Sequence, residues 1–124
     1  MQIEFNKTAK FFIEGFVTQP NIKMRLKHNT YDFNVVTIPS TQKKNNIVFA
    51  SILPTIENSQ IIESGIIYLK YGGHYTVEFF GSDNTSTTIT DTDLFIKSEQ
   101  VYYKTQIPEN YAMPGNRATK SLPT

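Results

Sequence analysis

The chain of 124 residues contains no cysteine and no tryptophan, and it has only four alanines and five leucines. The absence of cysteine excludes disulfide bonds and thiolate metal sites, and it suits a protein that is assembled in a reducing cytoplasm. Because alanine and leucine are strong helix formers, their scarcity argues against a helical protein. Nine phenylalanines, seven tyrosines and many β-branched residues favour strands instead.

Long apolar runs and a strong charge of one sign are also missing. No run approaches the length that crosses a bilayer, and charges spread through residues 1–15 predict that there is no signal peptide. The net charge is +1, but residues 1–44 carry seven Lys/Arg and three Asp/Glu, whereas residues 45–104 carry three and seven. Such blocks fit head-to-tail contacts between copies or docking on a charged partner, and they equally fit ordinary solvated faces. We expect no membrane association.

Alternating apolar and polar residues mark the strand around which the domain is organised. The run 75–79 reads Tyr-Thr-Val-Glu-Phe, which is the period-two pattern of a strand with one buried face. The glycine pair at 72–73 predicts a tight turn just before it, because glycine reaches positive φ without steric cost. A second alternating run, 94–105, follows after a polar connection. Together these runs predict central antiparallel strands.

Further strands are expected at 22–27, 31–38 and 47–53, with a polar loop at 39–46. In all, about seven to nine short strands with turn signals between them are typical of a sandwich or a barrel. The strand at 22–27 is predicted to have a basic outer face made of Lys23, Arg25 and Lys27.

The pattern divides the chain into three segments. Residues 1–19 are interpreted as an N-terminal strand or arm, residues 20–105 as the β-sandwich domain, and residues 106–124 as an extended C-terminal tail. The tail is assigned from its prolines and from the loss of alternation after residue 105. Such a tail is either disordered or ordered by a partner.

The sequence offers little chemistry. His28 and His74 are the only histidines, and neither has a second ligand at the spacing of a zinc site. His74 is explained as a polar residue at the start of a strand, and His28 begins a predicted turn at 28–30. No nucleophile, base and orienting group form a recognisable set, so we expect no enzyme activity and no cofactor.

Two kinds of ligand are weighed and set aside. Asp83, Asp91 and Asp93 bracket one loop and could converge on calcium, but they lack the spacing of an EF-hand, and Asx turns explain the same residues. The basic strand face would suit nucleic acid. Because the net charge is near zero and the aromatic residues alternate as core residues, we expect no nucleic-acid binding.

Two segments carry a resemblance to a known family. Residues 66–81 contain Gly-Gly-His-Tyr-Thr-Val-Glu-Phe-Phe-Gly, and residues 94–105 contain Leu-Phe-Ile-Lys-Ser-Glu-Gln-Val-Tyr-Tyr-Lys. A Gly-x-Tyr-x-hydrophobic strand, a polar loop and an amphipathic final strand resemble the later half of small immunoglobulin-like virion proteins of tailed bacteriophages. Auxiliary capsid proteins of crAss-like phages are the nearest type. The resemblance covers roughly residues 22–105 and excludes both ends of the chain.

The resemblance implies an immunoglobulin-like antiparallel β-sandwich with a structural role in a virion that is assembled in the host cytoplasm. The protein would then be an auxiliary or decoration capsid protein, bound to the capsid lattice or to a head–tail junction. Its partners would be the major capsid protein or other virion proteins, with self-association as a further option. The residues chosen as anchors for a partner are Phe11, Phe12, Phe16, Tyr111 and Met113, although the phenylalanines equally fit a core.

The alternative is a non-catalytic β-sandwich module that binds carbohydrate or a cell-surface ligand through exposed tyrosines and the loop 82–93. The pair Tyr102–Tyr103 must place one ring on each face of its strand, so one ring is available for stacking. An enzyme is the third and least supported reading.

Overall fold

The computed structural model describes residues 1–15, 17–56 and 63–105, and within them the protein is built from strands without a helix. The all-β prediction is therefore confirmed. None of the described residues belongs to an apolar helix long enough to span a membrane. The strands are β1 (Gln2–Glu4), β2 (Ala9–Glu14), β3 (Asn21–His28), β4 (Asn34–Lys44), β5 (Ile47–Pro54), β6 (Glu63–Ser64), β7 (Ile66–Ile67), β8 (Gly73–Ser82) and β9 (Leu94–Lys104).

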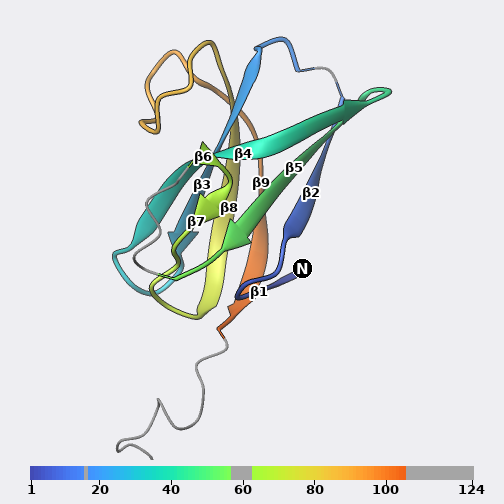
Figure 1. Ribbon diagram of the computed structural model, residues 1–124. Coiled ribbons are helices and arrows are strands. Elements are labelled where there is room, and N and C mark those ends of the chain that lie inside the picture. Colours follow the sequence, from blue (N-terminus) through green and yellow to red (C-terminus); the bar gives the residue numbers. More distant parts are fainter. Residues whose placement is uncertain (16, 57–62, 106–124) are drawn as a thin grey trace, which may run out of the picture.

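The strands follow one hydrogen-bonded path in the order β1-β9-β8-β3-β4-β5-β2 (Figure 1). Neighbours on this path are antiparallel except β1 and β9, which are parallel, and the two-residue strands β6 and β7 pair with β4 and β5 beside it. Strand β2 at one end of the path lies close to β9, which is next to the other end, and Lys97 on β9 donates a hydrogen bond to the carbonyl oxygen of Phe12 on β2 at 2.6 Å. The sheet is thus nearly closed into a barrel. The immunoglobulin-like sandwich stays a prediction.

Strand β4 passes from one part of the sheet to another. It pairs with β3 up to Thr37 and with β5 from Ser40 onward. Pro39 lies between these two ladders, where its missing N–H removes no antiparallel hydrogen bond. This division of pairing lets one strand turn the corner of the barrel.

The predicted loop at 39–46 is wrong. Strand β4 continues to Lys44 and pairs there with Ile47, so only Asn45 and Asn46 form the turn, with Asn45 at a φ of 58°. The polar residues 41–44 are exposed. Backbone hydrogen bonds to β5, rather than an apolar face, therefore hold this part of the strand. The alternation of apolar and polar residues could not reveal a strand here.

The core lies between the inner faces of β3 and β8 and the strands that curl around them. Tyr75, Val77 and Phe79 are each 0% exposed, which confirms the alternation predicted for this run. Across the strand pair, Leu26 faces Val77 and Met24 faces Phe79. These facing apolar pairs define the inside of the barrel.

The N-terminal segment belongs to the sheet rather than standing apart from it. Residues 1–19 are predicted above as a strand or arm beside a β domain at 20–105, and they form strands, because β1 and β2 supply the two ends of the sheet path. Strand β2 does so because Ala9, Phe11 and Ile13 recur at period two and are all buried against the core. The tail at 106–124 lies outside the described residues.

Candidate interaction site between strands β2 and β9

The sheet has two strand edges that face each other across an open seam. Strand β2 pairs with β5 on one side and ends the sheet path, so no described strand pairs with its other side. Strand β9 pairs with β1 only at residues 102–104, which leaves its part at 94–100 without a described partner opposite β8. Unpaired strand edges present backbone donors and acceptors to any strand that approaches.

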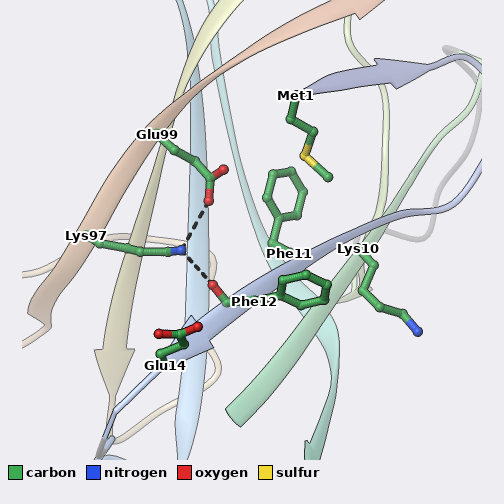
Figure 2. A pocket seen from close by; sticks show the side chains of 7 residues that line it. All are labelled: Met1, Lys10, Phe11, Phe12, Glu14, Lys97 and Glu99. Atoms are coloured by element: carbon green, nitrogen blue, oxygen red, sulfur yellow. Dashed lines mark hydrogen bonds and ion pairs between the residues drawn. The ribbon is translucent and has the colours of Figure 1, made fainter.

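A groove of about 490 Å³ lies at this seam (Figure 2). The Phe12 side chain projects beside it, is 54% exposed, and packs edge-on against Phe49 with 5.2 Å between ring centroids. Lys10 lies over the same Phe49 ring at 5.6 Å. The groove is lined by Met1, Lys10, Phe11, Phe12, Glu14, Lys97 and Glu99.

Lys97 crosses the seam. Its ammonium donates to the Phe12 carbonyl oxygen at 2.6 Å, pairs with Glu99 at 3.2 Å, and lies 5.4 Å from the centre of the Phe79 ring. Figure 2 shows Lys97 reaching from β9 to the backbone of β2. The ammonium occupies the position from which the N–H of a neighbouring strand would otherwise donate a hydrogen bond to the Phe12 carbonyl oxygen.

The hydrogen bond from Lys97 also shows which backbone groups of β2 face the seam. In a strand, the N–H and C=O of one residue point to the same side, and successive residues alternate. Because the Phe12 carbonyl points to the seam, the backbone groups of Lys10, Phe12 and Glu14 all face the open edge. Those of the intervening residues face β5.

The structure separates the residues predicted to bind a partner. Phe11 is 2% exposed and belongs to the core, whereas Phe12 on the same strand is 54% exposed at the groove. Phe16, Tyr111 and Met113 lie outside the described residues. Of the anchors that can be placed, only Phe12 presents its ring to a partner.

Sequence reasoning missed the charged residues of β9 in this site. Lys97 and Glu99 pair across the sheet with Phe79 and Val77, so they lie on the core-facing side of β9. The sequence could have revealed their orientation, because Glu99 and Lys97 lie two and four positions before the buried Val101 and therefore share its face. A charge on the buried face of a strand is typical of a protected sheet edge.

The loop 82–93 is closed over a buried lysine. The Lys23 and Asp93 side chains are 0% and 1% exposed, and the ammonium contacts the Asp93 carboxylate at 3.0 Å and the Thr88 carbonyl oxygen at 2.7 Å. Ser82 donates its hydroxyl to the other Asp93 oxygen at 2.6 Å. That hydrogen bond, the Thr90 N–H and the lysine together lower the pKa of Asp93 to about 2.

The predicted basic outer face holds at Arg25 and Lys27 and fails at Lys23, which is buried. Lys23 is covered by the loop, and Arg25 pairs with Glu78 at 2.7 Å. Lys27 remains exposed. Acidic residues from β8 and from the following loop pair with Arg25 and Lys23, so two of the three cations are neutralised.

The acidic loop does not assemble a cation site in the described chain. The Asp93 carboxylate is already occupied by the lysine and by two hydrogen-bond donors. Within residues 1–15, 17–56 and 63–105, no group of three or more His, Asp or Glu side chains is placed to hold a metal ion.

Both histidines have contacts of a structural kind. His28 Nδ1 accepts hydrogen bonds from the backbone N–H groups of Thr30 and Tyr31 at 3.0 and 3.1 Å. Its Nε2 therefore carries the proton and donates to the Gly72 carbonyl oxygen at 2.9 Å. His28 thus fixes two turns to each other. His74 is exposed and contacts the Tyr102 ring.

An exposed tyrosine and a half-buried one lie at the other end of β3 from the loop 82–93. Tyr31 is 53% exposed and packs against Tyr71 with 4.4 Å between ring centroids. The loop begins beside the first residue of β3, whereas Tyr31 follows its last. An eight-residue strand spans about 25 Å, so these tyrosines and the loop do not form one binding site.

The last tyrosine pair lies as predicted. Tyr102 is 42% exposed and Tyr103 is 2% exposed, so one ring lies on each face of β9.

Comparison with protein-family models, with curated proteins and with solved structures gives no match to this chain. The geometry of the seam is therefore the basis for a functional proposal.

Proposed function

We propose that this protein is a non-catalytic structural component that joins an assembly through the groove between β2 and β9. The observation that carries the proposal is the open edge of β2, whose backbone groups face the groove beside the exposed Phe12 ring. An added strand would gain affinity from backbone hydrogen bonds and specificity from the side chains at alternate positions. Phe12 is the anchor for such a partner.

The assembly that we propose is a bacteriophage virion, with this chain as an auxiliary or decoration capsid protein built in the host cytoplasm. The partner would be the major capsid protein or another virion protein. This part of the proposal rests on the sequence resemblance, as does the immunoglobulin-like sandwich. The division of β4 between two ladders supports a two-layer description, because strands that change sheets form the corners of sandwiches.

Sedimentation of particles from cells that carry the gene tests the proposal. We expect the wild-type chain to sediment with virions, and Phe12→Asp to be lost from them while its circular dichroism remains that of the folded protein. Tyr31→Asp is the matched control, because Tyr31 is as exposed as Phe12 but lies away from the groove. Absence of the wild-type chain from the particles, or full occupancy by Phe12→Asp, would contradict the proposal.

A second candidate function is carbohydrate binding at the pair formed by the exposed Tyr31 and the half-buried Tyr71. The observation that favours it is the shallow angle of 34° between the two rings, which are also backed by His28. Titration with a panel of oligosaccharides tests it. Binding that is lost in Tyr31→Ala and kept in Phe12→Ala would favour this function over the structural one.

A further inference from the structure

We infer that the open edge of β2 pairs antiparallel with β2 of a second copy of this chain, with Phe12 directly opposite the partner's Phe12. The inference rests on the proposed assembly function and names the partner at the same groove. Three features of the described residues carry it: the direction of the backbone groups, the order of the charges along β2, and the exposure of Phe12.

The backbone direction restricts the register of pairing. Lys10, Phe12 and Glu14 turn their N–H and C=O groups to the open edge, so they must oppose residues of the same set in the partner. A two-fold axis at Phe12 meets this condition. It places Lys10 opposite the partner's Glu14 and Glu14 opposite the partner's Lys10. Each opposed pair then exchanges two backbone hydrogen bonds, about six in total.

The charges along the edge select this register among the alternatives. Lys10 and Glu14 are exposed on the outer face of β2, and neither has an ion-pair partner within the described parts of the chain. A two-fold axis at either of them would oppose two like charges, which is unfavourable. The axis at Phe12 opposes unlike charges twice. The order Lys-x-Phe-x-Glu is thus complementary to itself, as an isologous contact requires.

Pairing also covers the Phe12 ring, which is 54% exposed in the free chain. The two Phe12 rings would meet at the axis, each backed by its own Phe49. The cost is the hydrogen bond from Lys97 to the Phe12 carbonyl. The Lys97 side chain, which is 37% exposed, keeps its ion pair with Glu99. The carbonyl exchanges an ammonium donor for an N–H of the partner strand.

Charge reversal tests the pairing in the free protein. We expect the wild-type chain to dimerise with increasing concentration in light scattering. Lys10→Glu and Glu14→Lys should each weaken the dimer by roughly tenfold or more, because each change opposes like charges at both symmetric pairs. An equimolar mixture of the two variants should restore dimerisation, since only the mixed dimer opposes unlike charges. A monomeric wild-type chain, or single variants that dimerise like wild type, would overturn the inference.

Cysteine cross-linking tests the register, since the chain has no cysteine of its own. Under mild oxidation, Phe12→Cys should form a covalent dimer, because opposed residues lie within the Cα separation of about 4.4–6.8 Å that a disulfide needs. Lys10→Cys alone should not, whereas Lys10→Cys mixed with Glu14→Cys should. Cross-linking of Lys10→Cys to itself as readily as Phe12→Cys would overturn the register.

These results are separable from the outcome for the proposed function, because they concern the free chain. A monomer that still needs Phe12 to join particles would overturn self-pairing and leave the structural role, with a strand of another virion protein in the groove. A dimer that is absent from particles would instead overturn the virion role alone.

Discussion

At the scale of single residues, neighbours in the chain occupy opposite environments. Phe11 is buried in the core and Phe12 is exposed at the groove. The sequence contained this distinction, because Lys10 and Glu14 share the parity of Phe12 and mark the outer face of β2. Treating the phenylalanines as one group of anchors obscured it.

The first prediction contrasts these two rings. Phe11→Ala should lower the free energy of unfolding by about 3–5 kcal/mol, because it leaves a cavity in the core. Phe12→Ala should lower it by less than about 1 kcal/mol in the monomer, since its ring is largely in water. Urea denaturation at low protein concentration measures both values. Equal losses would show that the two rings are not on opposite faces.

The second prediction concerns the buried ion pair beneath the loop 82–93. Lys23→Met should lower the free energy of unfolding by about 3–5 kcal/mol, because it leaves the Asp93 carboxylate buried without its cation. Lys27→Met on the same strand is the control, and a change within about 0.5 kcal/mol is expected there because Lys27 is exposed. Similar denaturation curves for the two variants would contradict a buried pair.

The third prediction follows from the pKa of Asp93, which is lowered from 3.8 to about 2 in the folded protein. The unfolded chain therefore takes up a proton first as pH falls. The stabilisation is complete above the unfolded pKa and is lost as pH falls from about 4 through about 2. Thermal unfolding between pH 5 and pH 2 should show this loss, and Asp93→Asn should flatten it. An unchanged slope in that variant would contradict the assignment.

At the scale of the elements, alternation predicted the strands that have one buried face and failed where both faces are exposed. The residues at 22–27 and 75–79 were placed correctly because their inner side chains fill the core. The distal part of β4 was not, since residues 41–44 meet solvent on both faces. Backbone pairing alone leaves no hydrophobic pattern to detect.

The fourth prediction concerns Gly65, which lies between β6 and β7 at a φ of +80°. A Cβ there would collide with the backbone carbonyl oxygen of Ser51. Gly65→Ala should lower the free energy of unfolding by about 2–3 kcal/mol through strain and the clash together.

Gly15→Ala provides the matched control for that substitution. Its φ is also positive, at +99°, but a Cβ would meet no atom within 4 Å. Only the backbone strain applies, so a loss of about 1–2 kcal/mol is expected. Denaturation curves of both variants separate strain from the clash, and a larger loss for Gly15→Ala would contradict this packing.

At the scale of the whole molecule, the seam could not be predicted from the sequence. The parallel pairing of Ile3 with Tyr103 joins opposite ends of the described chain, and no local pattern encodes such a contact. The sequence predicted an all-β protein and the orientation of its central strands. It did not predict that two edges would remain open beside Phe12, because that outcome depends on how the whole sheet closes.

Strand β2 is proposed to present an open edge through which the protein assembles. Amide hydrogen exchange of Phe12, followed by NMR at rising protein concentration, tests it most directly. In dilute solution the Phe12 amide should exchange much faster than the Phe11 amide, which faces β5, and it should become protected as the protein associates. A Phe12 amide that is already protected in the dilute monomer, or that stays unprotected in the assembly, would contradict the claim.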